Sequence, residues 1–155
     1  MWQRIQTVFL VIAIISLIAA IFFPIWIHEA IGQSHKLYAL HYSIVAQSGE
    51  MIRTQYMPYS LTAILAVASI TISIIEIGKY KDRMLQMKLG ALNSLLLAGT
   101  IASAFIFSNQ LAKDFGGGKL GLGLWLPGIA VLCNLLANRF IRRDEKLVRD
   151  SDRLR

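Results

Sequence analysis

The chain has 155 residues, of which 55% are hydrophobic and 16% are charged, with a formal net charge of +7 and a mean hydropathy of +0.55. Ordinary soluble domains carry about 25% charged residues, so this composition favours a membrane protein over a soluble domain. The single cysteine, Cys133, excludes an internal disulfide and a cysteine-based zinc site within one chain.

Four apolar stretches with little charge follow one another along the chain. A hydrocarbon core about 30 Å thick requires about 20 helical residues, and each stretch is long enough. They predict transmembrane spans at residues 5–27, 59–78, 89–111 and 120–141, followed by a charged cytoplasmic tail at residues 142–155. The predicted fold class is therefore an all-α membrane protein, in which residues 1–155 form one bundle of four transmembrane helices.

The first stretch has one feature of a signal peptide, because Arg4 precedes its apolar core. The apolar core is too long for a signal peptide, however, and Ala19 and Ala20 lead into the bulky sequence IFFPIW rather than a cleavage site. We therefore expect a retained helix with Trp26 at the membrane interface, where amphipathic aromatic rings settle.

The segment between the first two spans has turn and strand signals. The β-prone runs KLYALHYSIV and MIRTQYM flank AQSGE, which predicts a small β-hairpin with an antiparallel pair around Ser48 and Gly49. The histidines of this loop, with Glu29, have irregular spacing, so we expect no metal site and no cofactor; they are His28, His35 and His41. The glycine-rich AKDFGGGKLGLG lacks the spacing and the hydroxyl residue of a phosphate loop, so we expect a flexible turn.

Basic residues are distributed unevenly between the predicted loops. Of the 16 Lys and Arg residues, 12 lie at the N-terminus, between the second and third spans, or from Arg139 onward. Positively charged loops stay in the cytoplasm, which predicts a multi-pass protein with both termini cytoplasmic. The tail also carries Asp144 and Glu145 and lacks the aromatic residues of single-strand binders, so we expect no nucleic-acid partner.

Polar residues recur at one depth within the predicted spans, about one helical turn from the cytoplasmic charges. This predicted polar intramembrane cluster consists of Gln6, Glu76, Asn93 and Asn134. A membrane carboxylate is costly unless it is paired or hydrogen-bonded. One hypothesis is an interhelical clamp, in which Asn93 or Asn134 bonds to Glu76 with Lys79 or Arg139 as a counter-charge. The other is a proton or cation site at Glu76.

Three blocks of sequence carry a resemblance to a known family. They are MWQRIQTVFL at the start, YKDRMLQMKLGALNSLL in the middle and NRFIRRDEKLVRDSDRLR at the end. With these blocks the whole chain resembles the domain-of-unknown-function family numbered four-two-nine-three. The resemblance implies a small integral membrane protein of Bacteroidota bacteria, and it implies no activity. Its family-like positions are Arg4, Gln6, Arg83, Leu85, Gln86, Asn93, Arg143, Asp144, Glu145, Asp152, Arg153, Leu154 and Arg155.

All of these positions lie on the predicted cytoplasmic side, which suggests an interaction face. The expected face consists of Arg83, Gln86, Lys88, Arg143, Asp144, Glu145 and Arg153. Oppositely charged residues at i and i+4 predict that the tail continues the fourth helix. The tail has four candidate roles: docking under the loop at residues 79–88, binding anionic lipid headgroups, receiving a protein partner, or only fixing the topology.

No pairing of a nucleophile with a base is evident, so we expect a protein without enzymatic activity. The first functional hypothesis is an inner-membrane accessory, scaffold or assembly subunit of a larger membrane complex. The alternative is a small oligomeric transporter or channel that uses Glu76 as a coupling carboxylate. The expected partners are the bilayer with its anionic headgroups and another membrane protein or a second copy of the chain.

Overall fold

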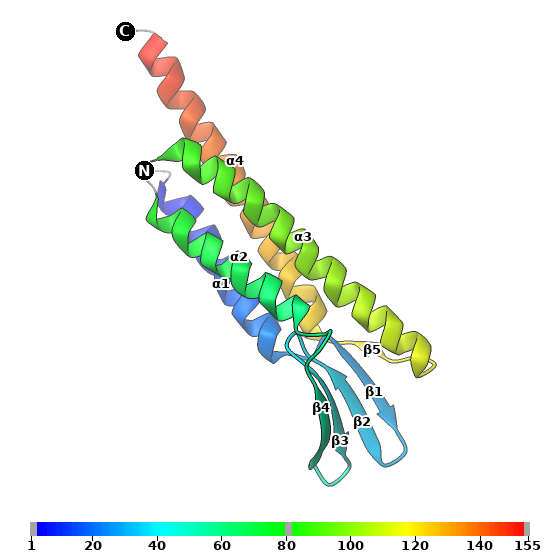
Figure 1. Cartoon of the computed structure of the whole chain (residues 1–155). Coiled ribbons are helices and arrows are strands. Elements are labelled where there is room, and N and C mark those ends of the chain that lie inside the picture. The colour runs from blue at the N-terminus through cyan, green and yellow to red at the C-terminus, as the bar shows by residue number, and fades with distance from the viewer. Residues whose placement is uncertain (1–2, 80–81, 154–155) are drawn as a thin grey trace.

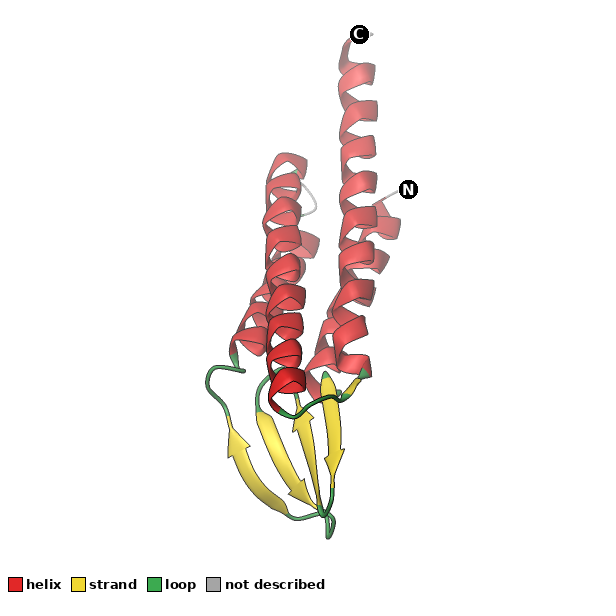
Figure 2. Cartoon of the chain, turned by 90° about the vertical axis from the view of Figure 1, so that its right-hand side faces the viewer, coloured by secondary structure: helices red, strands yellow, loops and turns green. Residues whose placement is uncertain are grey.

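The computed structural model describes residues 3–79 and 82–153, and for residues 3, 4 and 149–153 it describes the backbone only. The described elements, in chain order, are α1 (Gln3–Phe22), β1 (Trp26–Ala30), β2 (Gln33–Leu37), β3 (Tyr42–Ala46), β4 (Met51–Gln55), α2 (Leu61–Gly78), α3 (Arg83–Asp114), β5 (Lys119–Leu120) and α4 (Leu122–Arg153). The helices run side by side, and the strands lie beyond one end of them (Figures 1 and 2). Both ends of the chain lie at the opposite end (Figure 1).

The predicted all-α fold class with a small hairpin is wrong. Within the described residues the strands form one antiparallel sheet of five, in the order β4-β3-β2-β1-β5. β3 and β4 flank Ser48 and Gly49, but they are only two strands of this sheet. β5 comes from the glycine-rich segment that we expected to be a flexible turn, because Lys119 and Leu120 pair with β1.

The first predicted span, residues 5–27, also extends too far. α1 ends at Phe22, just before Pro24, which has no N–H to donate and disfavours a helical residue before it. The chain then turns into β1, and Trp26 is the first residue of that strand. Its side chain is only 1% exposed, so the ring packs inside the protein; its position at the membrane interface stays a prediction.

A local signal marks the start of α3. The side chain of Asp82 caps α3 by accepting a hydrogen bond from the Leu85 N–H at 3.0 Å. α3 and α4 have 32 residues each, or about 48 Å at 1.5 Å per residue, so both are longer than a bilayer core requires. α4 includes residues 142–153, so the charged tail continues the fourth helix, as the i, i+4 charge pairs predicted.

In the described part of the chain, all four helices are long and apolar enough to cross a membrane. α1 packs against α2 and α4, and α3 packs against α2 and α4. The contact surfaces include the fully or almost fully buried alanines Ala13, Ala66 and Ala130, together with Leu17 and Leu97. Small residues suit this role because helices in lipid associate through close packing rather than through a hydrophobic drive.

A second apolar core joins the sheet to the end of α3. Trp26, Leu37 and Tyr42 from the strands pack with Leu111 of α3. Phe115, which follows α3 directly, lies over the sheet, and its ring centroid is 4.4 Å from that of His35. The sheet is therefore packed on the helical region through the long α3 and is not an independent loop.

Two glycines allow the start of α4 to lie against the end of α1. Gly121 N–H donates to Ile25 O at 2.8 Å, and Gly123 N–H donates to Pro24 O at 3.0 Å. A Cβ atom at Gly123 would overlap the backbone carbonyls of Phe23 and Pro24. This junction, which no sequence motif indicates, holds β5 beside β1.

Candidate functional site

Asn93 of α3 is the centre of a buried hydrogen-bond network between helices. Its Oδ1 accepts from Ser69 Oγ at 2.5 Å, and its Nδ2 donates to Ser73 Oγ at 2.9 Å. Ser69 and Ser73 are one turn apart on α2, so they present their hydroxyls on one face. The same Nδ2 donates to Asn134 Oδ1 of α4 at 3.1 Å. Asn93 thus links three elements: α2, its own helix and α4.

Asn134 extends the network along α4. Its Nδ2 donates to Ser94 Oγ at 2.8 Å and to the carbonyl oxygen of Gly90 at 3.3 Å. One turn further, Asn138 Nδ2 donates to the same Gly90 carbonyl at 3.1 Å. A Cβ at position 90 would overlap the Asn138 side chain, so glycine is required for this close approach. All the hydrogen-bonding groups of Asn93 and Asn134 are used, which favours a single, well-ordered arrangement.

Glu76 lies on the same face of α2, one turn after Ser73, but it stays outside the network. Its side chain is fully buried. Neither carboxylate oxygen has a hydrogen-bond partner among the described residues. The clamp hypothesis predicted a hydrogen bond between Glu76 and Asn93 or Asn134. Both amides instead bond to each other, to serine hydroxyls and to the Gly90 carbonyl. Lys79 and Arg139, the expected counter-charges, are exposed residues.

Gln86 is hydrogen-bonded to the backbone of Glu76. Its Nε2 donates to the backbone carbonyl of Glu76 at 2.9 Å, which ties the start of α3 to the end of α2. Gln86 Oε1 has no partner within the described part of the chain. The Glu76 carboxylate and the Gln86 carbonyl are thus both acceptors without donors in one buried region.

The structure brings the predicted cluster together only in part. All four predicted residues, Gln6, Glu76, Asn93 and Asn134, are at most 3% exposed. Asn93 bonds directly to Asn134, whereas no bond joins Glu76 to either amide. Sequence reasoning did not assign Gln86 to this cluster, although its position seven residues before Asn93 places both side chains on one face of α3.

The residues of the predicted interaction face differ in how far they are buried. Gln86 is 1% exposed, so it belongs to the buried cluster and not to the surface. Arg83 Nη1 donates to the backbone carbonyl of Asp144 at 3.0 Å, which fixes the beginning of α3 against α4. Lys88 and Arg143 are exposed, whereas Asp144 and Glu145 are half-buried. The side chain of Arg153 lies outside the described residues.

His28 and His35 of the sheet contact other aromatic rings. His28 and His35 face each other across β1 and β2, with ring centroids 6.0 Å apart. A hydrogen bond of 2.5 Å joins His35 Nδ1 to the Tyr42 hydroxyl. Burial lowers the pKa of His35, and the positive charge of His28 lowers it further. Among the described residues, no group of three or more His, Cys, Asp or Glu side chains is placed to hold a metal ion.

The asparagine and serine network and the Glu76 carboxylate differ in what they can do chemically. The asparagine and serine network is saturated with internal hydrogen bonds, so its role is to hold α2, α3 and α4 together. Glu76 is the exception, because a carboxylate buried without a donor is costly to keep. It is therefore the residue of this region with capacity for a proton or cation.

Comparison with known proteins gives one assignment. No curated protein matches the chain. The family described as Domain of unknown function (DUF4293) matches residues 2–154. Because this match covers nearly the whole sequence, the chain belongs to the DUF4293 family.

Proposed function

We propose that the chain is a non-enzymatic integral membrane protein that serves as an accessory, scaffold or assembly subunit of a larger membrane complex. The observation that carries this proposal is the shape of α4. Its C-terminal turns run past the ends of the other helices and project from the helical region (Figure 1).

The projecting part of α4 has the properties of a docking helix. Leu147 is 56% exposed and Val148 is 42% exposed, and the neighbouring Lys146 is exposed as well. The bond from Arg83 to the Asp144 carbonyl holds the helix in place where the projection starts. A fixed helix that presents apolar residues between charges suits a hydrophobic groove on a partner. That partner is another membrane protein or a second copy of the chain.

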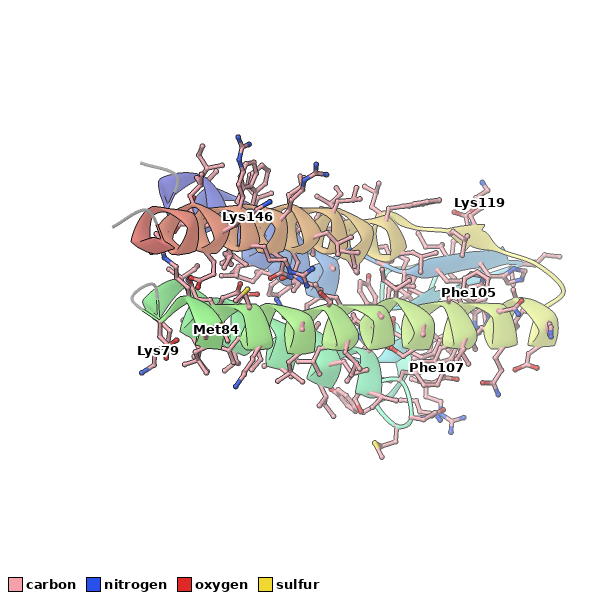
Figure 3. The ribbon with its side chains drawn as sticks, turned by 90° about the horizontal axis from the view of Figure 1, so that it is seen from above. Lys79, Met84, Phe105, Phe107, Lys119 and Lys146 are labelled. Atoms are coloured by element: carbon pink, nitrogen blue, oxygen red, sulfur yellow. The ribbon has the colours of Figure 1, made fainter. Side chains whose placement is uncertain are left out.

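The proposal includes a multi-pass location in the bacterial inner membrane with both termini cytoplasmic. Lys79 and Lys146 lie at the end of the molecule where the chain begins and ends, whereas Lys119 lies at the sheet end (Figure 3). The excess of basic residues at the first end supports a cytoplasmic position for it. The sheet would then face the extracytoplasmic side.

Purification in mild detergent tests the docking role. We expect the parent to retain a co-purifying membrane protein, and we expect Leu147→Asp to release it without lowering the melting temperature. Ile31→Asp is the matched control, because Ile31 is fully exposed at the turn between β1 and β2. Equal retention of the same protein by the parent and by Leu147→Asp would contradict the proposal.

A second candidate function is a small oligomeric transporter or channel that couples protons through Glu76. The fully buried carboxylate without a partner among the described residues favours it, because such groups mark proton and ion pathways in membranes. Proton-linked flux in liposomes that disappears with Glu76→Gln would establish this function in place of the scaffold.

A further inference from the structure

A groove lies on the outer surface of the helical region, between α3 and α4. Its volume is about 410 Å³. Ala91 and Ser94 line it from α3, and the α4 side is lined by Leu135, Asn138, Arg139 and Arg142. Ala91 and Leu135 are exposed, so the groove opens toward the surroundings of the helices. Ser94 and Asn138, which also line it, belong to the asparagine and serine network.

The groove crosses the boundary between the apolar and charged parts of both helices. On α4, no charged residue occurs from Leu122 to Asn138, and Arg139 is the first. On α3, Lys88 is the last charged residue before an uncharged stretch that runs to Ala112. From Leu135 to Arg142 the groove extends about 10 Å along α4 at 1.5 Å per residue. One end of the groove is therefore apolar and the other is basic.

The charge at the basic end is not compensated by the groove itself. No acidic residue lines it. Within the described part of the chain, the side chains of Arg139 and Arg142 have neither an ion pair nor a hydrogen bond. Lys88 adds a third positive charge one turn from Ala91, at the same rim. Guanidinium groups bind phosphate oxygens with paired N–H donors, and basic pockets between membrane helices bind phospholipid headgroups.

We propose that this groove is a binding site for an anionic phospholipid. Arg139 and Arg142 hold the headgroup phosphate, and one acyl chain lies along Ala91 and Leu135 toward the middle of the bilayer. A soluble phosphate compound would use the arginines alone and would leave the apolar end empty. The combination of both ends in one groove is what selects a lipid. The proposal does not depend on which protein partner, if any, α4 binds.

Native mass spectrometry of the detergent-purified chain tests the site with phosphatidylglycerol as the probe and phosphatidylcholine as the neutral comparison. We expect phosphatidylglycerol to bind more tightly. Removing both charges with Arg139→Gln and Arg142→Gln should weaken its binding about 25-fold, from about fivefold for each basic residue, which corresponds to about 1 kcal/mol per residue. The control is Lys79→Gln, an exposed basic residue at the same end of the molecule but outside the groove, which should change binding less than twofold.

A second variant separates the apolar end from the charged end. Ala91→Phe fills the groove and keeps both arginines, so it should weaken phosphatidylglycerol binding while free glycerol phosphate is unaffected. Unchanged melting temperatures without lipid would show that all variants fold. Three results would each overturn the proposal: equal binding of the two lipids, parent-like binding by the double arginine variant, or displacement of the lipid by glycerol phosphate at equal concentration.

Discussion

Replacing Glu76 with leucine would reveal whether the buried carboxylate supports the fold. Both carboxylate oxygens lack a partner in the described structure, so Glu76→Leu removes no hydrogen bond. It does remove a buried polar group without a partner, whose desolvation costs about 1–3 kcal/mol. We therefore expect the free energy of unfolding to rise by about that amount.

Asn93→Leu at a similar depth is the matched comparison. Asn93 forms three side-chain hydrogen bonds, to Ser69, Ser73 and Asn134. At about 0.6 kcal/mol for each hydrogen bond in a membrane protein, their loss should lower the free energy of unfolding by about 2 kcal/mol. The two leucine variants should thus change stability in opposite directions.

Calorimetric melting in one mild detergent measures both variants beside the parent. A higher melting temperature for Glu76→Leu and a lower one for Asn93→Leu would show that Glu76 is kept for a reason other than stability. If Glu76→Leu loses as much stability as Asn93→Leu, then the carboxylate is part of the hydrogen-bonded clamp after all, and the reasoning from its unpaired oxygens is refuted.

Two further predictions concern the sheet and its junction with the helices. Gly123→Ala should lower the melting temperature strongly, because its Cβ would overlap backbone carbonyls, whereas Gly128→Ala should not, because that position is open; similar melting of the two variants would contradict the close junction. The lowered pKa of His35 means that the unfolded chain binds more protons below a pH of about 6.5, so stability should fall as the pH drops through that region. His35→Phe should reduce this pH dependence, and an unchanged pH profile of the melting temperature would show that His35 does not titrate with folding.

The number and order of the helices are the part of the fold that the sequence predicts well, because each uncharged stretch is long enough to cross a bilayer core. The helix ends are predicted less well. α3 extends beyond its expected span at both ends, whereas α4 begins two residues inside its expected span and continues past residue 141 through the charged tail. Pro24 is a helix-ending signal in the sequence, and using it would have placed the end of α1 before Trp26.

The sheet was underestimated because most of its strands are short and have mixed patterns. The first two residues of β1, Trp26 and Ile27, were assigned to the first span because they continue its apolar run. β5 has two residues, and only its pairing with β1 makes it a strand. Such pairing is a long-range contact that local composition does not reveal. The packing of Phe115 and Leu111 on the sheet depends on the same tertiary arrangement.

The candidate site, like the fold, was predicted from the sequence only in part. The distance of each residue from the basic residues at its helix end predicted that Asn93, Asn134 and Glu76 would lie at similar depth, and all three are buried. Spacing does not determine which donor meets which acceptor. Ser69, Ser73 and Asn134 together saturate the Asn93 amide, and the Glu76 carboxylate has no hydrogen-bond partner among the described residues.

Photo-crosslinking in growing cells tests the proposed accessory role most directly. A photoreactive residue replaces Leu147 on the projecting end of α4, and the comparison position is Leu95 of α3, which is 70% exposed within the apolar part of the helix. We expect Leu147 to form a discrete adduct with a protein and Leu95 to form none. An absence of protein adducts at Leu147, with or without adducts at Leu95, would contradict the proposal that α4 docks a partner.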